Sequence, residues 1–261
     1  KGTPLYRACE NGHVEVVRVL LTADLDVNQA RDNGSTPLYI ASRNGNEEIV
    51  RALLTKGADV NKAKNDGETP LMIACWSGHL DVVRALLESG VDVNYQNNGD
   101  TALYMACLMN RAEVVRALLE SGANVNSQNH GETPLILVCN NRYPIKFEDN
   151  SPYQKSLKLV RALLEFGADV NYRQNNGVTA LLLACARDND EIVQELLNRN
   201  ASFDFTFYTM YERILKDKLT QAQARRLGEE EATKPGRGFV RLRGTVQFEG
   251  FKEEITKAVP K

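Results

Sequence analysis

A short phrase returns six times along the chain. The copies read GTPLYRAC (2–9), GSTPLYIAS (34–42), GETPLMIAC (67–75), GDTALYMAC (99–107), GETPLILVC (131–139) and GVTALLLAC (177–185). Their threonines fall at positions 3, 36, 69, 101, 133 and 179, so the spacings are 33, 33, 32, 32 and 46 residues. A period near 33 residues is typical of a solenoid whose unit is one turn and two helices. The repeat therefore predicts an all-α repeat solenoid.

A second apolar run follows each copy of the phrase. These runs, VVRVLL, IVRALL, VVRALL, VVRALL, LVRALL and IVQELL, have apolar residues at helical spacing. Threonine and proline at the start of the phrase suit a helix N-terminus, because the threonine oxygen accepts a bond from an early backbone N–H. The glycine two residues before the threonine fits a turn with positive φ. Five asparagines that follow the second run are predicted to bond the turn backbone: Asn28, Asn61, Asn94, Asn126 and Asn171.

The phrase resembles the signature of the ankyrin-repeat family, T-P-L-H-x-A at a period of 33 residues. The resemblance covers roughly residues 2 to 205. It departs from the family at the signature histidine, which the family uses for side chain to backbone hydrogen bonds. The loss of those bonds predicts an array of moderate stability. The residues at this position are Tyr6, Tyr39, Met72, Tyr104, Ile136 and Leu182.

The resemblance implies ankyrin repeats, with hairpin-like finger loops, over residues 1–205. The expected repeats are 1–33, 34–66, 67–98, 99–130, 131–176 and 177–205. In the fifth repeat, the spacing of 46 residues leaves an insertion over 140–155, which contains NNRYPIKFEDNSPYQ and reads as a loop before a helix that begins near Lys155. Loops of this length are usually functional or disordered.

The pattern changes after residue 205. Apolar residues at helical spacing predict a capping helix over 206–228 that covers the open face of the last repeat. Residues 229–238 read as a flexible linker. Residues 239–261 open with an alternation of apolar and polar residues, which predicts a short β-like tail or the start of another domain.

Charge and motif content exclude several classes of function. The chain has 32 Lys and Arg against 34 Asp and Glu, and a net charge of -2 gives no general attraction to nucleic acid or an anionic membrane. No stretch approaches a membrane-spanning length of apolar residues. Signatures of hydrolases, metalloproteases, nucleotide-binding loops and kinases are missing from the sequence, so we expect neither enzymatic activity nor a cofactor or metal.

The cysteines are expected to be structural. All five occupy one repeat position, and none has the CxxC spacing of a zinc site. Helices of adjacent repeats are too far apart for disulfides between neighbours, so the cysteines are predicted to form a packing ladder. They are Cys9, Cys75, Cys107, Cys139 and Cys185.

The family resemblance also implies a binding face. Ankyrin arrays generally bind partners on the concave side, which the fingers and the exposed ends of the first helices form. The expected fingers are 29–35, 62–68, 95–100, 127–132 and 172–178, and the helix positions follow each Ala-Cys pair.

These positions need not be apolar to hold the fold, yet the middle copies have Trp76, the only tryptophan of the chain, beside Leu108 and Met109. That composition is typical of a binding hot spot, while the alternative is that these side chains only cover their helices. The predicted partner-binding residues are Trp76, Leu108, Met109, Tyr95, Arg43, Tyr39, Tyr104 and Tyr172.

The sequence thus predicts a non-catalytic scaffold or adaptor that binds a peptide or a protein domain in the concave groove. We expect a monomer that acts inside the cell, in the cytoplasm or nucleus, without nucleic acid and without membrane insertion. The alternative is a targeting or regulatory module of a larger enzyme or channel, which the opening on Lys1 and the strand-like tail favour. A third hypothesis makes the C-terminal segment an autoinhibitory or donated peptide.

Overall fold

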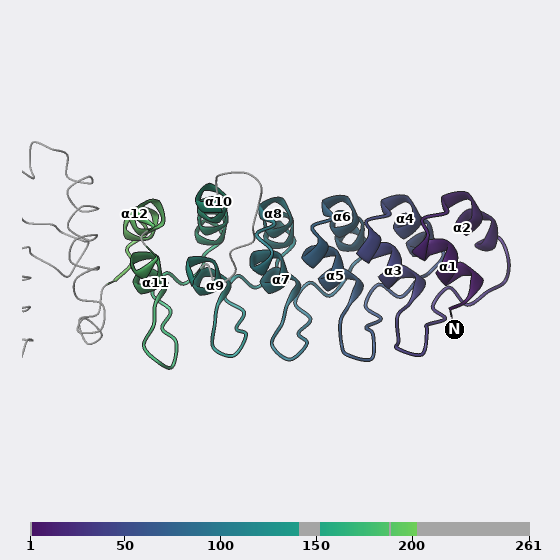
Figure 1. The fold of residues 1–261 in the computed structure, drawn as a ribbon, viewed down its shortest axis with the longest axis horizontal. Coiled ribbons are helices and arrows are strands. Elements are labelled where there is room, and N and C mark those ends of the chain that lie inside the picture. The colour runs from purple at the N-terminus through teal and green to yellow at the C-terminus, as the bar shows by residue number, and fades with distance from the viewer. Residues whose placement is uncertain (1, 141–151, 188, 203–261) are drawn as a thin grey trace, which may run out of the picture. The chain divides into compact units, whose positions relative to one another are not determined.

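The computed structural model describes residues 2–140, 152–187 and 189–202. In these ranges the chain forms twelve α-helices and no β-strand, and the helices occur in pairs (Figure 1). The predicted all-α repeat fold is confirmed. The helices are α1 (Pro4–Glu10), α2 (Val14–Leu20), α3 (Pro37–Asn44), α4 (Glu47–Thr55), α5 (Pro70–Ser77), α6 (Leu80–Glu88), α7 (Ala102–Leu108), α8 (Ala112–Glu120), α9 (Pro134–Asn140), α10 (Pro152–Glu165), α11 (Ala180–Ala186) and α12 (Asp190–Asn198).

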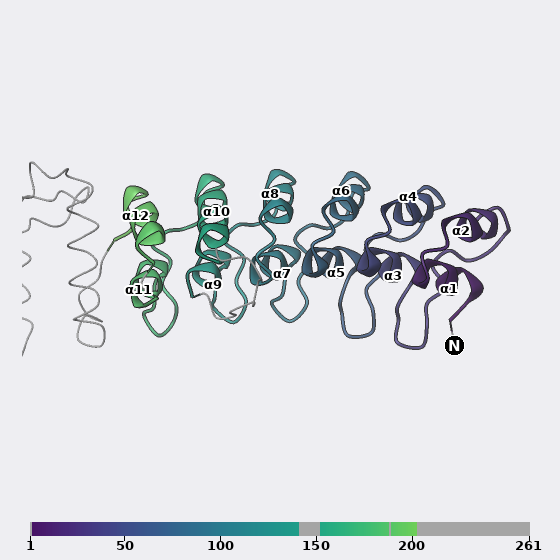
Figure 2. The same cartoon turned by 45° about the horizontal axis from the view of Figure 1, so that its top comes forward.

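Contacts between residues group the chain into two compact units. Of the described residues, the first comprises 2–138 and 152–168, and the second comprises 139–140, 169–187 and 189–202. Within the first unit, α1, α3, α5 and α7 lie in one row and α2, α4, α6, α8 and α10 in a second row (Figure 1, Figure 2). Neighbours within a row pack on each other, as α3 does on α5 and α4 on α6. In the second unit, α11 packs on α12.

The repeated threonine begins each helix of the first row. In α3, the Thr36 hydroxyl accepts a hydrogen bond of 3.1 Å from the backbone N–H of Tyr39, and proline takes the first helical position. Such a cap contributes about 1 kcal/mol. The helix ends at Gly45, whose φ of 77° is the left-handed conformation that glycine adopts without strain. The helix start expected from the phrase is confirmed.

The finger loops have two lengths, which explains why the threonine spacing is 33 residues in two repeats and 32 in the next two. The finger that contains Gly67 has one residue of positive φ, at 87°. The next finger is one residue shorter, since the threonine spacing falls from 33 to 32. There, Asn97 and Asp100 exchange two backbone hydrogen bonds of 2.9 Å, and both intervening residues, Asn98 and Gly99, have positive φ. Two consecutive positive values are typical of the tight type I′ hairpin turn.

The core lies between the two rows and between successive pairs. The apolar positions of the second helices that face the preceding pair are buried wherever a pair precedes them. Val82 on α6 is 1% exposed, whereas Val16, at the same position of α2, is 49% exposed because no described helix pair lies on that side. The burial of this position therefore comes from the neighbouring repeat and not from the helix itself.

This comparison gives a matched pair of substitutions. Val82→Ala should lower the free energy of unfolding by about 2 kcal/mol, since it removes buried methyl groups and leaves a cavity. Val16→Ala, the same change at the same repeat position, should lower it by about 0.5 kcal/mol. Urea denaturation of both variants measures the difference, and equal losses would show that neighbouring repeats do not contribute the burial.

One helix begins earlier than the sequence indicates. The structure starts α10 at Pro152, before the expected Lys155, because proline is favoured at the first helical position. Residues 141–151 of the insertion lie outside the described residues. The predicted capping helix 206–228, the linker 229–238 and the β-like tail 239–261 also lie outside them.

Candidate protein-binding surface

The last turn of the first-row helices carries the candidate site. In α5, residues 71 to 75 are buried, and Trp76 is the first side chain to emerge, at 40% exposed. Arg43 on α3 and Leu108 on α7 occupy the same repeat position as Trp76. Because α3 packs on α5 and α5 on α7, the three positions follow one another along the row. The structure thus brings together the residues at the centre of the prediction.

Apolar side chains extend this position along α7. Leu108 and Met109 are partly exposed, and so is Met105, which lies one helical turn earlier. Sequence reasoning missed Met105, although its spacing of three residues from Leu108 places both on one face of the helix. We call Trp76, Met105, Leu108 and Met109 the Trp76 surface.

The tyrosines at the histidine position serve the fold. Tyr39 is 4% exposed, and its hydroxyl donates a hydrogen bond to Glu68 in the next finger. Burial, together with that bond, raises the pKa of Tyr39 above its ordinary range. Tyr104 is partly buried, and its hydroxyl donates to Glu132 at 2.9 Å. Each of these bonds joins a first-row helix to the finger of the following repeat.

The remaining predicted residues lie in different surroundings. Arg43 is exposed, and Tyr95 is partly buried at the base of its finger. Tyr172 belongs to the second unit and is also partly buried. The site therefore reduces to the Trp76 surface with Arg43 and Tyr95 on elements of the first unit.

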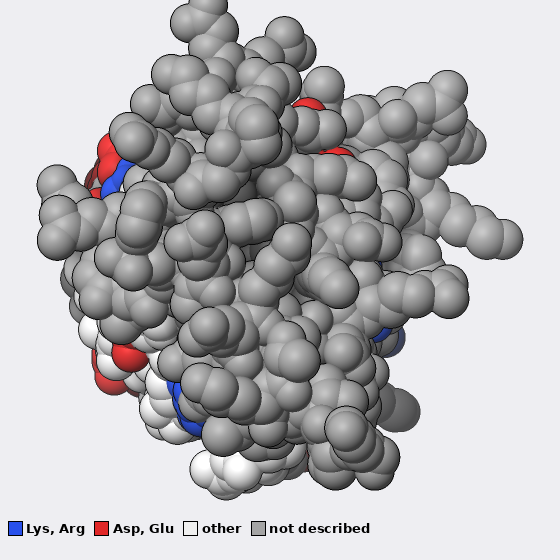
Figure 3. Space-filling view, turned by 90° about the vertical axis from the view of Figure 1, so that its left-hand side faces the viewer, with Lys and Arg blue, Asp and Glu red and all other residues white. Residues whose placement is uncertain are grey.

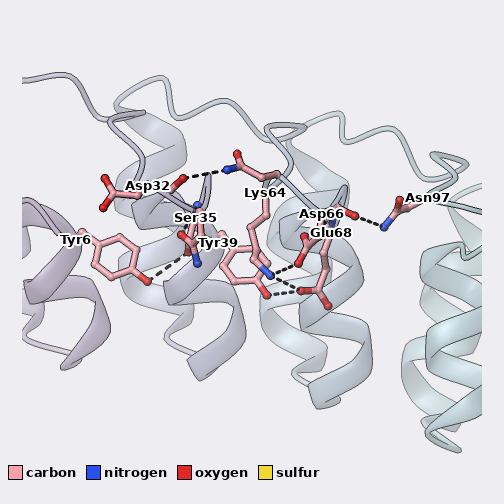
Figure 4. Close-up of polar contacts among 10 residues, drawn as sticks. Tyr6, Asp32, Ser35, Tyr39, Lys64, Asp66, Glu68 and Asn97 are labelled. Carbon is pink, nitrogen blue, oxygen red and sulfur yellow. Dashed lines mark hydrogen bonds and ion pairs between the residues drawn. The ribbon is translucent and has the colours of Figure 1, made fainter. Parts of the chain in front are cut away.

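Side chains join successive fingers to each other (Figure 4). The amide of Asn65 donates to the carbonyl oxygen of Asp32 at 2.9 Å, and the amide of Asn97 donates to that of Asp66, also at 2.9 Å. Lys64 lies 2.7 Å from the Asp66 carboxylate and holds the pKa of that carboxyl below its ordinary value. A platform fixed in this way loses little conformational entropy when a partner binds.

The five asparagines that follow the second apolar run of the first five repeats make further links. The Asn28 side chain accepts the backbone N–H of Asp59 at 2.7 Å, and Asn94 accepts that of Asn124 at 2.7 Å. The predicted role in bonding the backbone is confirmed, and the bonds reach the following repeat. Side-chain bonds to backbone further along the chain are made by Asn28, Asn61, Asn94, Asn126 and Asn171.

The link between two fingers can be broken at a glycine. A Cβ atom at Gly67 would lie 2.3 Å from the Asn97 Oδ1, whereas one at Gly90 meets nothing within 4 Å. Both glycines have positive φ, so Gly90→Ala should cost about 1 kcal/mol of stability from backbone strain alone. Gly67→Ala should cost about 2 kcal/mol, because it also displaces Asn97 from its hydrogen bond. Thermal unfolding of the two variants compares them, and an equal loss would contradict the role of the Asn97 link.

The cysteine ladder is buried, as predicted. None of the five cysteines forms a disulfide, and each is at most 4% exposed. Burial raises the pKa of Cys9 to about 12 and that of Cys75 and Cys107 above the ordinary range. A buried, protonated thiol is a poor nucleophile, so these cysteines act in packing.

The part of the chain that the structure describes has neither a cluster of metal-binding side chains nor a helix fit to cross a membrane. No three His, Cys, Asp or Glu side chains there lie close enough to hold a metal ion. No helix within the same residues is long and apolar enough to cross a membrane. Where the described surface is visible in Figure 3, both basic and acidic side chains occur.

Comparison with known proteins agrees with this architecture. A family model described as ankyrin repeats (3 copies) matches residues 5–97, 61–129, 94–147 and 151–210. No curated protein matches the chain.

Solved structures give the same result. An ankyrin repeat domain from Acinetobacter baumannii AYE is 31% identical, with a TM-score of 0.67 over 76% of this chain and 98% of that chain. The ankyrin repeat protein EF0377 is 28% identical, with a TM-score of 0.66 over 75% and 96%. The ankyrin repeat domain of Bcl-3, a member of the IkappaB protein family, is 29% identical, with a TM-score of 0.65 over 77% and 87%. On the family match, the fold and the repeated phrase together, this chain belongs to the ankyrin-repeat family.

Proposed function

We propose that the chain is a non-catalytic interaction module that binds a peptide or a protein domain on the Trp76 surface and the adjoining fingers. Ankyrin repeats are in general protein–protein interaction modules. The observation that carries the proposal is the exposure of Trp76. Among the described residues, the large apolar side chains that are exposed are Val16, Val19 and Trp76, and only Trp76 is aromatic.

An exposed tryptophan at this place favours binding over packing. Tryptophan is enriched at binding hot spots because one rigid side chain buries a large area when a partner covers it. The equivalent positions on neighbouring helices hold Arg43 and Leu108, so the fold does not require an aromatic residue there. A partner that covered this surface and the fingers would bury on the order of 1,200–2,000 Å² in total.

The roles of the other residues follow from their surroundings. Arg43 and Tyr95 are proposed to border the surface, and Tyr39 and Tyr104 to fix the fingers through Glu68 and Glu132. We place the interaction inside the cell, in the cytoplasm or nucleus, where buried thiols such as those of the ladder stay reduced.

A selection experiment tests the proposal. A displayed library of intracellular protein fragments is selected in parallel on the intact chain and on a Trp76→Ala, Met109→Ala variant that circular dichroism shows to be folded. A Val19→Ala variant, altered at an exposed apolar residue of α2, serves as the matched control. We expect ligands that the intact chain and the control retain and the double variant loses. Ligands that bind all three proteins equally would exclude the Trp76 surface.

A further inference from the structure

At least six of the twelve arginines in the described ranges form an ion pair with a neighbouring acid. Arg51 on α4 lies 2.8 Å from Glu47 and 2.8 Å from Glu88, and Arg116 on α8 lies 2.8 Å from Glu165. In the described ranges, the arginines whose side chains have neither an ion pair nor a hydrogen bond are Arg43, Arg84 and Arg111. Two of these three, Arg43 and Arg111, adjoin the Trp76 surface.

Arg43 lies on the α3 side of that surface. It has the same repeat position as Trp76, one repeat earlier, and its side chain is exposed. Its backbone is held in place, since the carbonyl oxygen of Arg43 is 3.1 Å from the Nε2 of His79. An exposed guanidinium without an ion pair, on a backbone that His79 holds, therefore lies one repeat before Trp76 in the row.

Arg111 lies on the other side, at the start of α8. A Cβ atom at Gly78 would lie 2.6 Å from the Nε and 2.8 Å from the Cζ of Arg111, so the guanidinium rests on Gly78, two residues after Trp76. In the preceding repeat, the His79 ring rests on Gly45 in the same way. The His79 ring is hydrogen-bonded to the carbonyl oxygen of Arg43. The Nε of Arg111, by contrast, is buried and has no hydrogen-bond partner.

A hollow adjoins this unpaired arginine. It measures about 330 Å³ and is lined by the turn at Gly78, the start of α8 and Lys158 of α10. Its charged residues are Arg111, Lys158 and Glu113, and the buried Oδ1 of Asn110 beside them also lacks a partner. The hollow thus offers two cations against one carboxylate.

We propose that the partner of the Trp76 surface is an acidic segment, in which an apolar anchor covers Trp76, Leu108 and Met109 and flanking Asp or Glu side chains pair with Arg43 and Arg111. The inference rests on the function proposed above and adds the chemistry of the partner. Arginine binds a carboxylate through paired, charge-assisted hydrogen bonds, and an arginine that pairs with no acid among the described residues is available for them. The apolar surface between the two arginines supplies the binding area, and the arginines select the charge of the partner.

Synthetic peptide pools of defined chemistry test this proposal. Three pools of short peptides carry a central Leu, Phe or Met, with flanking positions of Asp and Glu, of Ser and Asn, or of Lys and Arg. Because Trp76 is the only tryptophan of the chain, its fluorescence reports binding at the surface directly. We expect the acidic pool to bind at least about tenfold more tightly than the neutral pool. An acidic pool that binds no more tightly than the neutral pool overturns the proposal.

Variants separate charge selection from the surface itself. The double variant Arg43→Gln, Arg111→Gln should bind the acidic pool about tenfold or more weakly and bind the neutral pool with unchanged affinity. Arg84→Gln, the matched control on α6, should leave both pools unchanged. Glu113→Gln should raise the affinity for the acidic pool about threefold, because it removes the one carboxylate among the residues that line the hollow. In the intact chain, the ratio of the affinities for the acidic and neutral pools should also decrease when the salt concentration is raised from about 50 mM to about 500 mM. In the double variant this ratio should not change with salt.

The outcomes distinguish the two proposals. If Trp76→Ala abolishes peptide binding while the arginine substitutions leave it intact, the proposed binding surface stands and the proposal of an acidic partner is wrong. Because the Trp76→Ala variant has no tryptophan, its peptide binding is measured by the fluorescence anisotropy of a labelled peptide. If this variant still binds the peptides, both the proposed binding surface and the acidic partner are excluded.

Discussion

Replacing Leu118 by alanine should lower the free energy of unfolding of the chain by about 3 kcal/mol. Leu118 is fully buried in the last turn of α8, and α8 packs against α6, α7 and α10. The substitution removes buried methyl groups and leaves a cavity between successive repeats, so both interfaces of α8 lose contacts. In a solenoid, stability is close to a sum of repeat and interface contributions, and a fault in a middle repeat weakens the coupling on both sides.

Urea denaturation followed by circular dichroism measures this loss. The matched control is Leu54→Ala on α4, because Leu54 is partly exposed and its removal should cost less than half as much. A second expectation concerns cooperativity. The Leu118 variant should unfold over a broader range of urea concentrations, because the repeats on either side of α8 no longer unfold together. An equal loss in the two variants, with an unchanged transition width, would contradict the central role of α8.

The periodic features of this fold were predictable because they depend on local chemistry. A threonine followed by proline begins a helix whatever its neighbours, and a glycine in the finger allows a positive φ that other residues resist. The spacing of 32 rather than 33 residues was visible in the sequence, but its cause was not. The reason lies in the turn at Asn98 and Gly99, where two consecutive residues of positive φ replace a longer loop.

The surroundings of individual side chains were less predictable, because they depend on distances between repeats. Tyr39 and Trp76 are both aromatic residues within the first helices, yet Tyr39 is 4% exposed and Trp76 40% exposed. The difference follows from their positions relative to the row. Tyr39 lies in the first turn of α3 and points to the next finger, where Glu68 accepts a hydrogen bond from its hydroxyl, while Trp76 lies at the end of α5.

Arg111 shows the same limit at the candidate site. In the sequence it is one arginine among many, in a place where two other repeats have histidine. Only the structure shows that its guanidinium rests on Gly78, close to Trp76, without a partner for its Nε. An unpaired charge is a property of all the neighbours, so the sequence alone does not reveal it.

Trp76→Ala should weaken the binding of the partner by at least about 2 kcal/mol, which is a loss of roughly thirtyfold in affinity. The physical reason is that the indole buries its remaining exposed area, with that of Leu108 and Met109, only when a partner covers it. The same substitution should cost about 1 kcal/mol of stability, because the side chain is already partly buried in the free chain. A loss of binding free energy that exceeds the loss of unfolding free energy indicates a binding hot spot rather than a side chain that only packs on its own helix.

The measurement is titration calorimetry with a ligand selected on the intact chain, together with urea denaturation of each variant. Val19→Ala is the matched control, because Val19 is 68% exposed on α2 and lies away from the Trp76 surface. It should change neither affinity nor stability by more than about 0.5 kcal/mol. If Trp76→Ala weakens binding no more than Val19→Ala does, Trp76 only covers its helix, and the partner binds elsewhere on the chain. If it does weaken binding as expected, the exposed tryptophan at the end of α5 is what distinguishes this array as a binding module, since the repeat itself requires no aromatic residue there.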